Sequence, residues 1–249
     1  VESFARPILH TARWDHSLDL AGKRVGVIGT GATAVQLVPT IAPVVRQLHV
    51  FQRTPIWIFP KPDAEVPRVL QKLYQRLPLT QHSARMATNL TTEMIMVLGV
   101  VYTKQMRPLV KAVEGICRQH LKNQVKDPEV RRKLTPQYGF GCKRPSFSSD
   151  YLRTFNRPNV ELVTEGIERI TPTGIVTKDG VERELDVLVC ATGFKVFENG
   201  NTPTYKVYGL RGLELGEFWD EHRYQAYQGA SVPDFPNYFT VMGPYATTG

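Results

Sequence analysis

A glycine-rich turn between a hydrophobic strand and a helix constrains the fold of this chain more than any other feature. Residues 23–28, KRVGVI, are typical of a short buried strand, and residues 33–45 carry apolar side chains at helical spacing. Between the strand and the body of the helix lies GTGATA, residues 29–34. A second strand is expected at residues 46–53. This order predicts a βαβ unit and therefore a parallel sheet.

The turn has the pattern GxGxxA, which indicates a dinucleotide site because it follows a predicted strand and opens a predicted helix. Gly29 permits a tight turn, Gly31 lets the backbone approach a pyrophosphate, and Ala34 lets the helix pack closely on the strand. Amides at the start of the helix can then bind phosphate. The candidate cofactor-binding residues here are Gly29, Thr30, Gly31, Ala32, Thr33, Ala34 and Gln36. A tight turn without a ligand is the alternative.

The end of the second strand favours one dinucleotide over another. An NAD site usually carries an acidic residue about 20 residues after the glycines, where it binds the ribose 2′-hydroxyl. This chain has Gln52, Arg53 and Thr54 there, with no carboxylate. A guanidinium suits a 2′-phosphate, because it is planar and permanently charged. The sequence therefore favours NADPH over NADH, with Arg53 and Thr54 as candidate contacts.

A change of composition after the second strand predicts an insertion. Residues 63–135 are rich in Leu, Gln, Met, Lys and Arg, with apolar positions at helical spacing, so we expect several helices. Strand character returns at residues 159–163, and Lys178–Gly180 is typical of a hairpin turn. The predicted fold is α/β, a Rossmann-like NADP-binding domain formed by residues 23–62 and 136–185 around a helical insertion.

The positive charge is concentrated in the insertion. The net charge is +8, yet the segment from Lys61 to Arg144 holds 16 Lys and Arg against 6 Asp and Glu. Such a segment can bind nucleic acid or a phosphate-bearing ligand, or it can be a solvated helical face. A nucleic-acid-binding domain would need aromatic stacking motifs or a recognition helix, and the sequence shows neither. We therefore expect no nucleic-acid partner.

The remaining composition argues against metal, disulfide and membrane chemistry. The three cysteines are far apart and odd in number, which favours a reducing compartment, and we expect the cytoplasm. The six histidines lack the spacing of metal ligands, so we expect no metal. The longest apolar run, Met94–Tyr102, is too short to cross a bilayer, so we expect no membrane contact.

The first residues carry a more specific pattern. Phe4, His10 and Trp14-Asp15 have the spacing of the FxGxxxHxxxW(P/D) fingerprint, and Arg6 stands at its glycine position. This segment resembles the Baeyer–Villiger monooxygenases, a class B flavin-containing monooxygenase family whose fingerprint directly precedes the NADPH-binding glycines. Further stretches of the chain resemble successive landmarks of that family: VFQRTP, CKRP, FNRPNVELV, DVLVCATGF and GPYATTG.

The resemblance implies an NADPH- and FAD-dependent monooxygenase that inserts one oxygen atom of O₂ into a ketone through a C4a-peroxyflavin. The product would be an ester or lactone. The Lys–Arg pair of the family matches Lys143 and Arg144, so Lys143 would join Arg53 on the 2′-phosphate and Arg144 would be the catalytic cation. A fixed guanidinium stabilises negative charge that develops on oxygen. His10 is the second catalytic candidate.

The resemblance also implies that the chain is a fragment. The family has two dinucleotide-binding domains with an FAD fingerprint near the N-terminus, and this chain shows one fingerprint. Residues 1–22 would be the linker with the family fingerprint, and residues 186–249 would return to the FAD-binding domain. Where the chain returns to the FAD-binding domain, Thr192 and Gly193 are candidate cofactor contacts. An N- or S-oxygenating flavin monooxygenase and a non-catalytic NADP-binding fragment remain as alternatives.

Overall fold

The computed structural model describes residues 3–61, 63, 65–96, 102, 105–194, 205–241 and 243–244. The apolar run Met94–Tyr102 therefore lies mostly outside them. The chain divides into two compact units, Val1–Gly193 and Phe194–Gly249. Within the described helices, none is long and apolar enough to cross a membrane.

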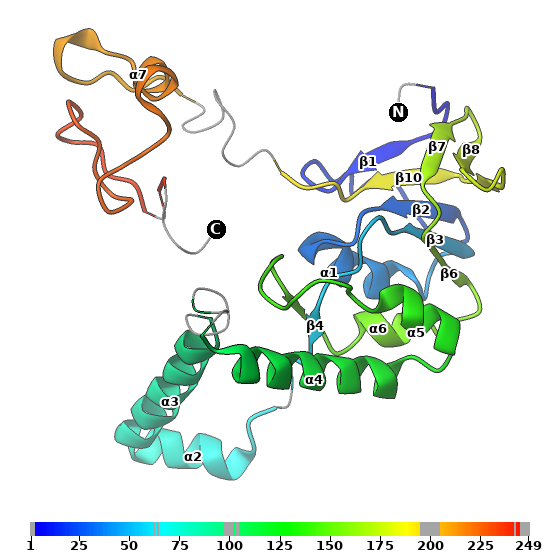
Figure 1. Cartoon of the computed structure of the whole chain (residues 1–249), viewed down its shortest axis with the longest axis horizontal. Helices are drawn as coiled ribbons and strands as arrows, with labels where there is room; N and C mark the ends of the chain where they lie inside the picture. Colours follow the sequence, from blue (N-terminus) through cyan, green and yellow to red (C-terminus); the bar gives the residue numbers. More distant parts are fainter. Residues whose placement is uncertain are drawn as a thin grey trace. The chain divides into compact units, whose positions relative to one another are not determined.

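A five-stranded parallel sheet forms the centre of the first unit (Figure 1). Its order is β1-β10-β2-β3-β6, and each neighbouring pair is parallel. The strands are β1 (Ile8–His10), β10 (Val187–Cys190), β2 (Arg24–Ile28), β3 (Gln47–Phe51) and β6 (Val160–Val163). The predicted α/β class with a parallel sheet is confirmed.

The predicted βαβ unit is formed by β2, α1 (Ala32–Ile41) and β3. The buried face of α1 consists of Ala34, Val35, Val38 and Ile41, which pack into the main core with the valines of β2 and β3. The predicted helix continued to residue 45, and this was wrong. Pro43 has no N–H to donate to the Pro39 carbonyl, so the helix ends at Ile41 with Ala42 as its C-cap.

Helices fill the insertion between β3 and β6, as the apolar spacing predicted. They are α2 (Arg68–Arg76), α3 (Pro78–Met96), α4 (Arg107–Gln124) and α5 (Pro128–Leu134). The Asp127 carboxylate caps α5 by accepting the amides of Glu129 and Val130. A short parallel pair, β4 (Ile58–Phe59) and β5 (Ser146–Phe147), and α6 (Tyr151–Thr154) complete this region.

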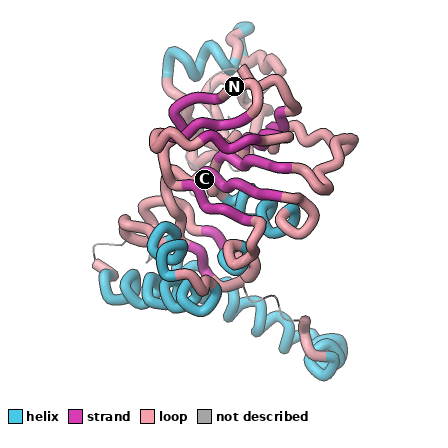
Figure 2. The backbone as a smooth tube through the Cα atoms, turned by 90° about the vertical axis from the view of Figure 1, so that its right-hand side faces the viewer, coloured by secondary structure: helices cyan, strands magenta, loops and turns pink. Residues whose placement is uncertain are grey.

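An antiparallel sheet connects β6 to β10 in the sequence. It consists of β7 (Ile167–Ile170), β8 (Gly174–Thr177) and β9 (Glu182–Glu184). The predicted hairpin turn at Lys178–Gly180 joins β8 to β9, with Gly180 at φ +79°. Figure 2 shows the strands of the chain lying side by side in magenta.

Two strands of the parallel sheet lie outside the ranges predicted for the NADP-binding domain. β1 belongs to the predicted linker and β10 to the predicted return segment, yet β10 pairs with both β1 and β2. These pairings join residues more than 150 positions apart. A local sequence pattern therefore gives no sign of them.

An ion-pair network joins the same strands at their amino ends. Asp186 Oδ1 accepts hydrogen bonds from Arg6 and from Arg24, both at 2.8 Å, and Oδ2 accepts the Arg24 amide at 2.8 Å. Arg6 also donates to the Leu185 carbonyl at 2.6 Å. Hydrogen bonds from Arg24 hold the pKa of Asp186 well below its usual range. Arg6 therefore ties the segment before β1 to the sheet.

The second unit is small and has its own core. It contains a 3₁₀ turn, η2 (Leu210–Gly212), and α7 (Leu215–His222). Leu215, Phe218 and Trp219 of α7 pack with Val232 and Phe235. None of the candidate site residues lies in this unit.

The Asp186 network predicts a pH-dependent contribution to stability. Because the folded pKa of Asp186 is lowered, its contribution is present above about pH 4, its ordinary pKa, and is lost as the pH falls through the folded value. Asp186→Asn should cost about 1 kcal/mol at pH 7, since the side chain is 32% exposed and partly screened. In urea unfolding, the free energies of unfolding of the wild type and of Asp186→Asn should converge between pH 7 and pH 2. A constant difference between them would contradict this role.

Candidate functional site

The candidate site residues follow the carboxyl ends of parallel strands. Because β1, β10, β2 and β3 are parallel, the segments that follow them emerge at one edge of the sheet. These segments are 10–11, 191–193, 29–31 and 52–54. β3 pairs with one side of β2, and β10, which comes later in the sequence, pairs with the other side. Ligands of open α/β sheets bind at such a switch point.

Gly29 makes the turn between β2 and α1 in close contact with the end of β10. Its φ is +111°, and a Cβ built on it would lie 2.4 Å from the Ala191 carbonyl oxygen. The Gly29 amide donates to the Phe51 carbonyl at 3.1 Å. The turn is therefore held against both neighbouring strands, and only glycine fits there.

Gly31 and the start of α1 present an open surface that suits phosphate. A Cβ on Gly31 would meet no atom within 4 Å. Gly31 is the N-cap residue, no side chain caps the first amides, and the first turn has no acidic residue. Unpaired amides and the positive end of the helix dipole attract an anion. Ala34 is fully buried, whereas Ala32 and Gln36 are exposed. These features fit a dinucleotide pyrophosphate.

The segment after β3 is fixed on two sides. The buried hydroxyl of Thr30 donates to the Thr54 carbonyl at 3.1 Å, which ties it to the glycine turn. The buried amide of Gln52 donates to the Lys133 carbonyl at the end of α5, at 2.8 Å. Arg53, between them, has an exposed side chain. The backbone of Arg53 is therefore anchored while its guanidinium is accessible.

The Lys143–Arg144 loop is joined to the same segment through Tyr138. The Tyr138 hydroxyl donates to the Pro55 carbonyl at 2.8 Å, and the indole N–H of Trp57 donates to the Tyr138 carbonyl at 3.0 Å. The Lys143 ammonium lies 5.2 Å from the centre of the Tyr138 ring. Lys143 and Arg144 are both exposed. In the described part of the chain, neither forms an ion pair.

His10 ends β1 at the same edge and is half-buried. Its Nδ1 accepts the Ala12 amide at 3.1 Å, so the neutral ring carries its proton on Nε2. The next residue, Thr11, has a buried hydroxyl with no hydrogen-bond partner among the described residues. His10 is therefore set to donate from Nε2.

Thr192 and Gly193 continue from β10 and are exposed. Gly193 has φ +105°, and a Cβ on it would meet no atom within 4 Å. The backbone after β10 is thus open to a ligand. It is also held at the glycine turn, because the preceding residue, Ala191, donates its amide to the Ile28 carbonyl at 2.9 Å.

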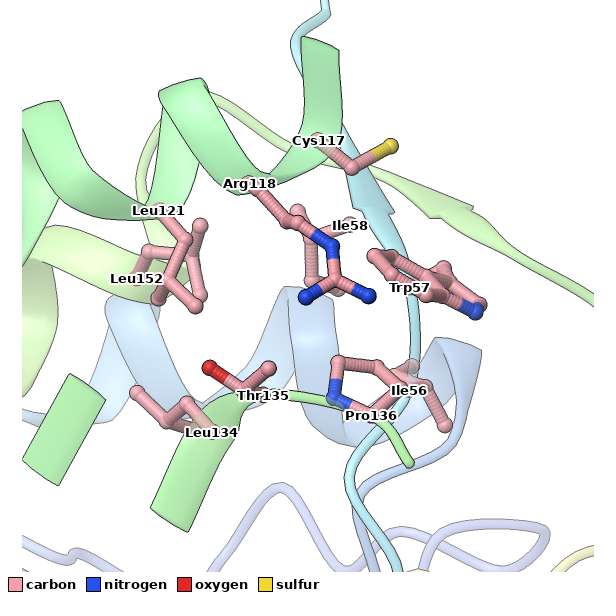
Figure 3. Close-up of a pocket in the computed structure, with 10 residues that line it drawn as sticks. All are labelled: Ile56, Trp57, Ile58, Cys117, Arg118, Leu121, Leu134, Thr135, Pro136 and Leu152. Carbon is pink, nitrogen blue, oxygen red and sulfur yellow. The ribbon is translucent and has the colours of Figure 1, made fainter. Parts of the chain in front are cut away.

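A small pocket lies among residues 56–58, α4 and the end of α5 (Figure 3). It has a volume of about 10 Å³, room for about one water. Arg118 lies 5.4 Å from the centre of the Trp57 ring at this pocket. Burial raises the pKa of the Cys117 thiol, also in the lining, to about 12. The pocket is too small for a nucleotide and its thiol stays protonated.

Two features of the site were missed by the sequence interpretation. Gln52 was considered only because it is not a carboxylate, and Tyr138 was not considered at all. Both make hydrogen bonds to residues about 80 positions away, which no local pattern reports. Among the described residues, no group of three or more His, Cys, Asp or Glu could hold a metal ion.

The comparisons with known proteins agree on one family, although no protein-family model matches the chain. A Baeyer–Villiger monooxygenase of Pseudomonas aeruginosa is 41% identical over 249 residues, all of this chain and 46% of that protein. An FAD-binding monooxygenase of Aspergillus niger is 34% identical over the whole chain and 40% of its own length. Cyclohexanone monooxygenase from Rhodococcus, solved with bound NADP⁺, matches with a TM-score of 0.80, 30% identity, 98% of this chain and 52% of that one.

The chain is homologous to the Baeyer–Villiger monooxygenases. The suspected resemblance is confirmed along the full chain, because the similarity begins at the fingerprint segment and continues to the last residues. The chain spans about half the length of the curated relatives it matches.

The two glycines of the turn should respond differently to alanine. Gly29→Ala forces a side chain at positive φ against the Ala191 carbonyl, and should destabilise the fold by about 2 kcal/mol or more. Gly31→Ala adds a methyl in open space at φ −72°, and should change stability by less than about 0.5 kcal/mol. Chemical unfolding measures both. Equal losses of stability in the two variants would contradict the described turn.

Proposed function

We propose that this chain supplies the NADP-binding part of a flavin-dependent monooxygenase that inserts one oxygen atom of O₂ into a ketone. The observation that carries the proposal is the carboxyl edge of the sheet. There the Thr30 hydroxyl of the glycine turn donates a hydrogen bond to the Thr54 carbonyl, next to Arg53. The Tyr138 hydroxyl donates to the Pro55 carbonyl of the same segment, and the Tyr138 ring contacts Lys143, next to Arg144. Relatives named as Baeyer–Villiger and cyclohexanone monooxygenases support the reaction.

In this proposal the pyrophosphate of NADP binds at the start of α1. The glycine turn, residues 29–34, would hold it through the uncapped amides at the start of α1, together with the exposed side-chain amide of Gln36. Arg53, Thr54 and Lys143 would bind the 2′-phosphate, because two exposed cations suit a doubly charged group. Thr192 and Gly193 would contact the cofactors through the open backbone after β10.

When bound, the reduced nicotinamide would supply a hydride. FAD, which the Aspergillus relative is named for binding, would supply oxygen activation. The residues of this chain contribute charge and position. Arg144 is permanently protonated, so it can stabilise negative charge on the oxygen of the reacting ketone. His10 would donate a hydrogen bond from Nε2, because its Nδ1 is occupied by the Ala12 amide.

Residues 1–22 would be the linker, 23–62 and 136–185 the NADP-binding domain, 63–135 the helical insertion and 186–249 the return segment. A cytoplasmic location is also proposed, and the three free cysteines support a reducing compartment.

Removing the Arg53 guanidinium tests the cofactor assignment. Arg53→Ala should weaken NADP⁺ binding by about tenfold to hundredfold and leave NAD⁺ binding unchanged, because only NADP⁺ carries the 2′-phosphate. Calorimetry on the purified chain gives both dissociation constants. Arg46→Ala is the matched control, since Arg46 is also exposed but precedes the amino end of the same strand. Equal weakening of both cofactors, or the same effect from Arg46→Ala, would contradict the assignment.

Arg144 should be needed for ketone oxidation and not for cofactor choice. Arg144→Ala, tested with the chain joined to a flavin-binding half as in its relatives, should lower ester formation by about 10²-fold to 10³-fold. It should still oxidise NADPH and should release hydrogen peroxide. Lys143→Ala should do the reverse, with weaker NADP⁺ binding and a smaller loss of ester formation. Unchanged ketone turnover in Arg144→Ala would show that Arg144 is a solvated loop residue.

A further inference from the structure

Tyr138 joins two segments that carry the proposed 2′-phosphate contacts. Its hydroxyl donates to the Pro55 carbonyl at 2.8 Å, two residues after Arg53. Its carbonyl accepts the Trp57 indole N–H at 3.0 Å. Two hydrogen bonds therefore join the segments, and each segment provides the donor of one and the acceptor of the other. Such a reciprocal pair fixes both distance and orientation, which one hydrogen bond alone does not.

The ring of Tyr138 makes the third contact. The Lys143 ammonium lies 5.2 Å from the ring centre, within the distance at which a cation is attracted to an aromatic face. A lysine side chain otherwise loses considerable rotamer entropy when a ligand immobilises it. A preformed contact with the ring reduces that cost. Lys143 is exposed, so its ammonium remains available to a ligand.

The connection extends to the glycine turn. Thr54 precedes Pro55, and its carbonyl accepts the Thr30 hydroxyl at 3.1 Å. Thr30 lies between Gly29 and Gly31. Tyr138, the segment after β3 and the glycine turn are therefore linked by consecutive hydrogen bonds. Burial raises the pKa of the Tyr138 phenol, so its hydroxyl stays a donor at neutral pH.

We infer that Tyr138 is a positioning residue that combines Arg53 and Lys143 into one site for the 2′-phosphate and so determines the preference for NADP over NAD. The inference rests on the proposed function, because it assumes that this edge binds NADP. The hydroxyl positions the Arg53 segment, and the ring positions Lys143. Tyr138 itself does not touch the phosphate.

The test separates the hydroxyl from the ring, with 2′,5′-ADP and 5′-AMP as probes that differ only in the 2′-phosphate. Tyr138→Phe removes the hydrogen bond and should weaken 2′,5′-ADP binding by about threefold to tenfold. Tyr138→Leu also removes the ring, and should weaken it by more than about tenfold. Binding of 5′-AMP should change by less than about twofold in both variants.

A matched control and a double-mutant cycle exclude a merely structural role. Tyr151→Phe removes a buried hydroxyl without a hydrogen-bond partner in the described chain, and should leave both affinities unchanged. In a Lys143→Ala background, Tyr138→Leu should weaken 2′,5′-ADP binding less than it does in the wild type, because the ring contact is already lost. Additive effects would overturn the role of the ring.

The outcomes distinguish the inference from the proposed function. If the wild-type chain binds 5′-AMP as tightly as 2′,5′-ADP, the proposed NADP site is wrong. If the wild type prefers 2′,5′-ADP and the Tyr138 variants keep that preference, the inference is wrong. If the Tyr138 variants bind both probes more weakly to the same extent and their melting temperature falls, Tyr138 only stabilises the fold. Should Tyr138→Leu fail to fold, Tyr138→Phe, which keeps the ring, still decides the role of the hydroxyl.

Discussion

The contact between Gly29 and the Ala191 carbonyl is the constraint on which the candidate site depends. A side chain at Gly29 would collide with that carbonyl, so the turn after β2 and the end of β10 approach as closely as backbone allows. This approach places the segment of Thr192 and Gly193 beside the glycine turn. Because β1 pairs with β10 in parallel, His10 emerges at the same edge. One small residue therefore lets three distant segments meet.

Charge is distributed unequally between the two ends of the sheet. At the amino ends, Arg6 and Arg24 are neutralised by Asp186 and Glu184. At the carboxyl ends, the described residues offer no carboxylate to Arg53, Lys143 or Arg144. Elsewhere in the basic segment, Arg132 pairs with Glu129 on the surface of α5, as expected of a solvated helix. The guanidinium of Arg53 is thus exposed on a segment that is hydrogen-bonded to the glycine turn, where the open helix start also favours an anion.

Local patterns predicted what depends on local physics. The βαβ unit followed from hydrophobic spacing around the glycines, and the hairpin turn followed from Lys178–Gly180. The helix end at Ile41 was misjudged, because the apolar pattern outweighed the effect of Pro43. The inclusion of β1 and β10 in the sheet could not be predicted, since it depends on pairing between distant residues. Tyr138 and Gln52 were missed for the same reason, because their partners lie about 80 residues away. Which residues bind cofactor stays a prediction.

Hydrogen exchange with and without NADP⁺ tests most directly whether this edge binds the dinucleotide. The first amides of α1 have no side-chain cap, so they should exchange fast in the free chain. With saturating NADP⁺, exchange should slow at residues 31–34, at 53–54 and in the loop of Lys143 and Arg144. Exchange at the amino ends of β2 and β10 should not change. Unchanged exchange at residues 31–34 with NADP⁺ bound, or protection at the amino ends instead, would contradict this account.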